Sequence, residues 1–141
     1  MGLNVYLNTK VWISYDNGIT SKCEDEEVYS GGTTHNLTEM EDKAGIYEAI
    51  WRPYRLRNDY PGFDDNDYKS EYEWESKQII TGQEIVDTLE KGLIKLKSDR
   101  KYFEQFNSSN GWGMYEHFVP FIESYLNACK EYPGAIVQVD R

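Results

Sequence analysis

The chain has 141 residues, enough for one domain with its own core, and a formal net charge of −10. Hydrophobic residues make up 39% of it, and 12 Tyr, 4 Trp and 5 Phe supply large apolar rings. The negative charge repels nucleic-acid phosphates, which argues against direct DNA or RNA binding, and no apolar run approaches the roughly 20 residues of a membrane-spanning helix.

The first ten residues show no basic segment followed by an apolar one, so no secretory signal is visible. We therefore expect a cytoplasmic protein without a membrane partner, with Cys23 and Cys129 as free thiols. No spacing of His and Cys residues is typical of a metal site, and no motif indicates a cofactor.

Apolar and polar residues alternate over 3–7 and 11–15, the period of a β-strand. The sequence Asp16-Asn17-Gly18 favours a turn, because Asn and Gly tolerate positive φ. This pattern predicts two or three antiparallel strands across 3–30, ended by the pair of glycines at 31–32.

The next segment is predicted to be helical. Thr38 and Glu41 match a capping box, in which a hydroxyl and a carboxylate satisfy the first free N–H groups of a helix. Gly45 is expected to interrupt this helix before a second turn that reaches Trp51, and Pro53 to stop it.

Residues 54–77 change character, because acidic and aromatic side chains alternate there. A solvated linker has no need of so many rings, so we expect a partly ordered loop, or a short strand near 72–74, lying on the body of the domain. We treat 56–77 as an insertion.

The C-terminal half predicts two long helices and a strand. A second capping box, Thr81 to Glu84, precedes a helix with a stripe of apolar residues, followed by a short helix over 99–106 and a loop over 107–113. The last helix includes Pro120, expected to kink it or mark its start, and 135–139 reads as a closing strand. We predict a single α+β domain over 1–141, with a small antiparallel or mixed sheet of N-terminal and C-terminal strands packed against three to four helices.

Three loops carry residues that could bind a ligand. The segment 33–36 precedes a predicted helix N-terminus, which suits anions, and His35 could serve as an acid or base. The alternative is structural: Thr34 or Asn36 caps the helix and His35 bonds a nearby carbonyl.

The second loop, 51–55, places two cations among three rings, and a guanidinium stacked on a ring recognises bases or phosphates. The alternative is that Trp51 anchors the core while Arg52 pairs with the acidic segment. In the third loop, 107–113, two glycines flank Trp112, which indicates either a binding loop or a tight connection with that ring in the core.

Several motifs occur together in order: 34–37 (THNL), 44–53 (AGIYEAIWRP), 106–115 (FNSSNGWGMY) and 125–133 (YLNACKEYP). Through them the chain resembles a group of small, uncharacterised proteins encoded by bacteriophages and prophages, although 56–77 is longer here than the connector of that group. The resemblance implies a protein made in the cytoplasm of an infected or lysogenic bacterium, and small phage accessory proteins commonly block host factors.

These observations favour binding over catalysis, and no catalytic residue is assigned. We expect an accessory protein that counters a host defence, either by sequestering a small anionic, nucleotide-like ligand or by blocking a host protein. The expected ligand-binding residues are Thr34, His35, Asn36, Trp51, Arg52, Asn110 and Trp112.

Two alternatives stay open, as does assembly into a homo-oligomer. The first is an acidic mimic of nucleic acid that inhibits a host protein. The second is a hydrolase or nucleotide-modifying enzyme that uses His35. The acidic face of the mimic would combine the run 24–27 with Asp59, Asp64, Asp65, Asp67, Glu71, Glu73 and Glu75.

Overall fold

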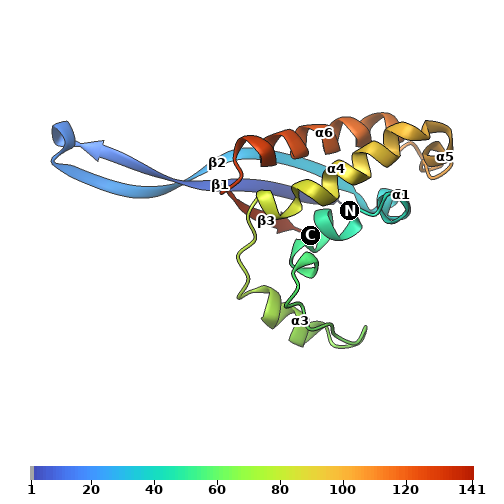
Figure 1. Cartoon of the computed structure of the whole chain (residues 1–141), viewed down its shortest axis with the longest axis horizontal. Helices are drawn as coiled ribbons and strands as arrows, with labels where there is room; N and C mark the ends of the chain where they lie inside the picture. Colours follow the sequence, from blue (N-terminus) through green and yellow to red (C-terminus); the bar gives the residue numbers. More distant parts are fainter. Residues whose placement is uncertain (1) are drawn as a thin grey trace.

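The computed structural model describes residues 2–141, and in it a three-stranded antiparallel sheet is covered on one face by helices (Figure 1). β1 (Gly2–Tyr15) and β2 (Thr20–Thr34) form a long hairpin, and β3 (Ile136–Asp140) pairs with the other edge of β1. The order is β2–β1–β3, so the predicted α+β class is confirmed, with N-terminal and C-terminal strands in one sheet.

The hairpin is closed by η1 (Asp16–Gly18), as the turn signal predicted, with positive φ at all three residues. Leu3, Val5 and Leu7 alternate into the core and are at most 1% exposed. The predicted end of the strands at 31–32 is wrong, because β2 continues to Thr34. Gly31 serves close packing instead: a Cβ there would lie 3.0 Å from the ring of Phe121.

The distal part of the hairpin leaves the body of the molecule (Figure 1). β3 pairs with β1 only over Asn4–Asn8, and residues 9–26 extend beyond this pairing as a two-stranded projection, here named the arm. Val28 is an extra residue at the base of the arm, since the register passes from Leu7↔Tyr29 to Asn8↔Glu27.

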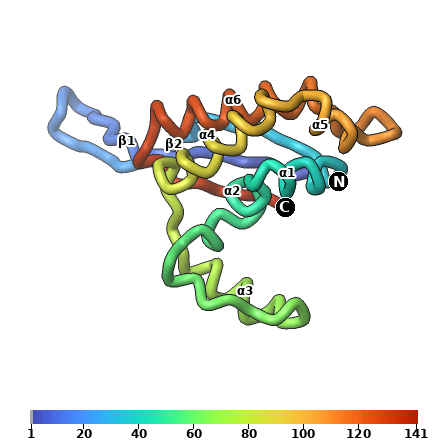
Figure 2. Tube along the Cα trace, turned by 45° about the vertical axis from the view of Figure 1, so that its right-hand side comes forward, coloured from blue at the N-terminus to red at the C-terminus, as the bar shows by residue number. Residues whose placement is uncertain are grey.

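The helices lie between β2 and β3. Two long ones, α4 and α6, run side by side over the sheet (Figures 1 and 2), and no helix within residues 2–141 is long and apolar enough to cross a bilayer. In order they are η2 (His35–Leu37), α1 (Thr38–Ala44), α2 (Tyr47–Trp51), η3 (Pro53–Leu56), α3 (Tyr68–Glu75), α4 (Gln83–Ser98), α5 (Arg100–Glu104) and α6 (Tyr115–Glu131).

The two predicted capping boxes have different outcomes. At the start of α4 the Glu84 carboxylate accepts from the Thr81 backbone N–H at 2.7 Å, as predicted. At the start of α1 the prediction is wrong, because Glu41 is fully buried and points into the core. Gly45 ends α1 in the left-handed conformation with φ 76°, which confirms the predicted interruption.

The segment 56–77 forms a second projection, whose helix α3 lies apart from the arm in both views (Figures 1 and 2). The strand predicted near 72–74 is therefore wrong. The helix begins after Asp67, whose carboxylate accepts from the backbone N–H of Ser70 at 3.3 Å. Pro120 lies inside α6 and does not mark its start.

Gly92 sets how closely α4 approaches the junction of α1 and α2. A Cβ at this position would lie 1.9 Å from Cγ2 of the buried Ile46. We expect Gly92→Ala to lower the free energy of unfolding by about 2 kcal/mol, although alanine is the better helix former. Urea denaturation measures the loss. Gly134→Ala is the control, because no atom of the described residues lies within 4 Å of a Cβ at this position. Equal losses in both variants would contradict the packing argument.

Candidate functional site

The segment from Thr34 to Asn36 contacts both of the other predicted loops. Asn36 donates from Nδ2 to the Trp112 carbonyl at 2.6 Å, and the His35 ring lies 4.6 Å from the Trp51 ring, centroid to centroid. Thr34 also caps η2, since its Oγ1 accepts from the Asn36 backbone N–H at 3.5 Å. The structural role predicted for Thr34 is therefore present.

The two tryptophans of these loops have opposite environments. Trp51 is 3% exposed and belongs to the core, whereas Trp112 is 74% exposed. Arg52 turns its guanidinium to the hydroxyl of Tyr54 at 3.0 Å, and the amide side chain of Asn110 accepts from the backbone N–H of Trp112 at 2.9 Å. The indole of Trp51 and the Arg52 cation are thus already engaged within the protein.

A cavity of about 260 Å³ lies between the end of β2 and the start of α6. Of the predicted ligand-binding residues only Thr34 contributes to its wall. No Lys or Arg is among its lining residues, so it suits an apolar group better than an anion. The cavity is lined by Gly32, Thr33, Thr34, Leu37, Gly113, Met114, His117, Phe118 and Phe121.

Glu41 is a buried carboxyl group that the sequence assigned to a helix cap. Its Oε2 accepts from the Trp51 indole N–H at 2.5 Å, and its Oε1 has no hydrogen-bond partner among residues 2–141. Burial disfavours the charged form and raises the pKa of Glu41 to about 8, although the indole hydrogen bond acts in the opposite direction. Glu41 therefore carries a proton over much of the neutral range.

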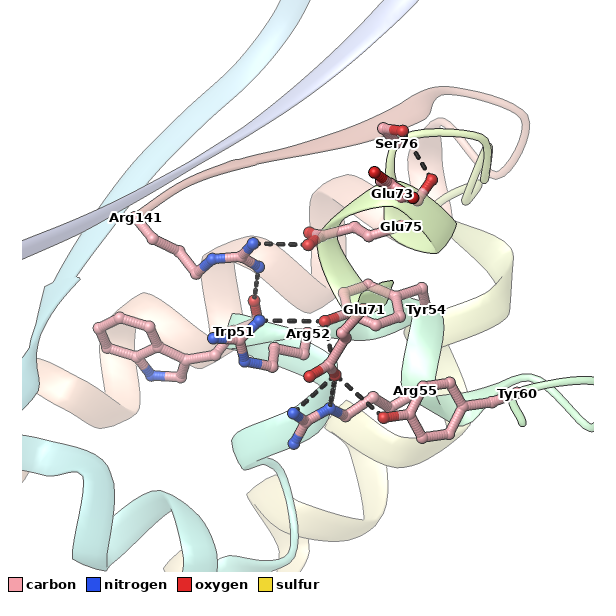
Figure 3. Close-up of polar contacts among 10 residues, drawn as sticks. All are labelled: Trp51, Arg52, Tyr54, Arg55, Tyr60, Glu71, Glu73, Glu75, Ser76 and Arg141. Atoms are coloured by element: carbon pink, nitrogen blue, oxygen red, sulfur yellow. Dashed lines mark hydrogen bonds and ion pairs between the residues drawn. The ribbon is translucent and has the colours of Figure 1, made fainter. Parts of the chain in front are cut away.

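Glu71 on α3 is the centre of a polar network that joins the second projection to the body (Figure 3). Its Oε1 accepts from Arg55 Nε at 2.8 Å, from the Tyr60 hydroxyl at 2.9 Å and from the Tyr54 hydroxyl at 3.0 Å. Burial alone would raise the pKa of Glu71, but these hydrogen bonds outweigh it and hold the pKa below its ordinary value. This carboxylate is occupied in holding the fold.

The acidic residues predicted as a nucleic-acid-like face are therefore divided. Three of them have structural roles. Glu71 is the centre of the network, Glu75 pairs with Arg141 at 2.7 Å (Figure 3), and Asp67 caps α3. Four remain on the exposed surface of the second projection: Asp59, Asp64, Asp65 and Glu73. The other acidic run, 24–27, lies on the arm, so the two runs occupy separate projections (Figure 1).

The arm exposes large apolar side chains. Trp12 is 73% exposed, Tyr15 44% and Ile19 86%. Strand β2 of the arm carries the consecutive carboxylates of 24–27, one of which, Asp25, pairs with Lys10 across the hairpin. The sequence predicted strands here and assigned a role only to the acidic run 24–27, as part of the nucleic-acid-like face. The sequence feature that indicates the arm is the apolar alternation of 11–15, which lies beyond Asn8, the last residue of β1 that pairs with β3.

No protein-family model, curated protein or solved structure matches this chain in comparisons of its sequence and fold.

Proposed function

We propose that this protein acts by binding a protein partner through its arm, and that it does not act by catalysis. The observation that supports this is the exposure of Trp12, Tyr15 and Ile19 on a hairpin that stands clear of the body. Exposed apolar side chains gathered in one region are typical of interaction sites. A two-stranded hairpin is also only marginally stable in water, so a partner that covers the arm would stabilise it.

The charge of the arm favours a basic partner. The carboxylates of 24–27 lie on the same hairpin as the exposed rings, in a chain with a net charge of −10. Such a surface speeds association with a positively charged protein and makes it sensitive to salt. In the phage context that the resemblance implies, the partner would be a host protein, and we propose a defence factor.

A protein partner is favoured over a small anionic ligand because of the contacts described above. Of the groups expected to hold an anion, the Trp51 ring lies in the core and the Arg52 guanidinium bonds the Tyr54 hydroxyl, whereas Trp112 is exposed. His35 packs against Trp51, and the neighbouring cavity has no Lys or Arg in its wall. Neither the ligand pocket nor a His35-dependent reaction gains support from this geometry.

Shortening the arm tests the proposal. Replacement of 9–26 by an Asn-Gly turn keeps the β1–β3 pairing over Asn4–Asn8, and we expect it to abolish capture of the partner from a bacterial lysate. The control is Asp64→Asn/Asp65→Asn on the second projection, which should capture the partner as the unaltered protein does. Quantitative mass spectrometry of the captured proteins measures both, at low and at high salt.

The proposal fails if the arm-shortened protein captures the same partner as the unaltered protein, or if the control variant alone loses it. Retention of a species of a few hundred daltons in native mass spectra, with no captured protein, would instead favour the small-ligand hypothesis.

A further inference from the structure

The two edges of the arm differ in charge. β2 carries the acidic run 24–27 and has a bulge at Val28, and both features discourage pairing with another strand. β1 has no such protection over Thr9–Tyr15, where Lys10 is its single charged residue. On that side the first residue of β3, Ile136, lies opposite Asn8, so within residues 2–141 no strand pairs with the edge of β1 along the arm.

The backbone direction along this edge follows from β3. The Val137 N–H bonds the Ile80 carbonyl at 2.8 Å, and the Ala135 carbonyl accepts from Gly82 at 2.9 Å, so these two residues point away from β1. The alternate residue, Ile136, must then face β1, where its partner in the register is Asn8. The N–H and C=O groups of every second residue of β1 point to the same side as those of Asn8. Those of Lys10, Trp12 and Ser14 therefore point to the open edge.

The geometry points to a second copy of this chain as the occupant of that edge. Two β1 strands pair antiparallel about a two-fold axis at Trp12, the midpoint of the open segment Thr9–Tyr15. The β1 strand of each copy then lies along the open edge of the other copy, between that copy's β3 and its hairpin turn. Val11 faces the second copy's Ile13, and Lys10 faces the second copy's Ser14, so no like charges meet across the axis.

The position of the acidic run favours pairing of two copies through β1 over pairing through β2. In the order β2–β1–β1–β2 the two acidic runs at 24–27 are three strand spacings apart, about 14 Å, which exceeds the Debye length of about 8 Å at physiological salt. A β2–β2 pairing centred on this run would place the carboxylates of the two copies one strand spacing, about 5 Å, apart. Joining through β1 also converts a marginal two-stranded arm into a four-stranded sheet and covers Trp12, which is 73% exposed in one copy.

This inference concerns self-association and is tested separately from the proposed function. Because the dimer covers Trp12, the protein partner of the proposed function would contact a dimer through Ile19 and the acidic run 24–27. The first test of the inference is the native mass of the unaltered protein at about 100 μM, a concentration above low-micromolar dissociation constants. We expect a dimer. The partner-capture experiment measures a different property, so either proposal can fail alone.

Cysteine cross-linking tests the register. Cys23 lies opposite Trp12 within the hairpin and is first replaced by Ser to prevent a disulfide inside the chain. In the Cys23→Ser background, Trp12→Cys places two thiols across the axis, at the Cα separation of about 5.5 Å that a disulfide needs. Ser14→Cys is the matched control, since its two copies would lie about 14 Å apart along the strands.

We expect mild oxidation to give a cross-linked dimer on non-reducing gels with Trp12→Cys and little with Ser14→Cys. A monomer at about 100 μM overturns the inference. A dimer that cross-links equally at both positions, or at neither, also overturns it, because the contact would then lie elsewhere.

Discussion

Glu41→Gln is expected to raise the free energy of unfolding by about 4 kcal/mol at pH 8 and to flatten its dependence on pH. The pKa of Glu41 is raised from 4.5 to about 8 by burial, so the folded state keeps a proton that the unfolded state releases. The unfolded state therefore binds fewer protons between these values, and stability falls as the pH rises through this window. The loss is complete above about pH 8.

Glutamine removes this loss because it stays neutral and can still accept from the Trp51 indole N–H. Urea denaturation of both proteins at several pH values between 5 and 8 measures the difference. Glu39→Gln, an exposed change on the same helix, is the control and should follow the unaltered protein. Parallel stability curves for the Glu41 variant and the unaltered protein would show that Glu41 does not titrate in this range.

Removal of the Glu71 carboxylate is expected to detach the second projection. Glu71→Ala leaves Arg55 and two tyrosine hydroxyls without their acceptor, at a cost of about 3 kcal/mol. Trypsin cleavage at Lys69 and Lys77, both exposed, should accelerate at least tenfold if that energy holds α3 in place. Gel electrophoresis of timed digests gives the rates.

The pH dependence of the Glu71 network has the opposite sign to that of Glu41. The pKa of Glu71 lies below its ordinary value, so its contribution is present above about pH 4.5 and is lost as the pH falls through the depressed pKa. Glu73→Gln is the matched control, because Glu73 is exposed on the same helix. Equal cleavage rates in the Glu71 and Glu73 variants would show that the network does not hold the projection.

The order and type of most elements follow from the sequence, because turn residues and periodicity are local signals. The turn at Asp16–Gly18, the helix that follows Thr81 and the closing strand agree with the pattern. The failure at Glu41 is instructive, since the same capping motif succeeds at Glu84. The two differ in tertiary burial, and a carboxylate drawn to a buried indole no longer reaches its own helix N-terminus.

The helix α3 could not be predicted from alternation alone. Aromatic residues at 68, 72 and 74 fit a strand as well as a helix, and the choice depends on contacts between distant residues. Glu71 reaches Arg55, and Trp74 packs 5.8 Å from Tyr54, centroid to centroid. These contacts bury one side of the segment in the helical arrangement.

The candidate site is less predictable than the fold. The contact between Asn36 and the Trp112 loop agrees with the idea that these segments meet, but which tryptophan is exposed depends on packing that no local pattern records. The projection of the arm could not be predicted from the sequence for a similar reason. Its projection results from the five-residue length of β3 against fourteen residues in β1, and sequence periodicity does not reveal which strands pair over what length.

The two thiols of this chain have very different reactivity. Burial raises the pKa of Cys129 to about 12, which leaves almost no thiolate at neutral pH, whereas Cys23 is exposed on the arm. A maleimide dye or spin label should therefore couple at Cys23 alone in the native protein. The arm thus carries its own attachment point for spectroscopy, and its motion can be followed without any substitution.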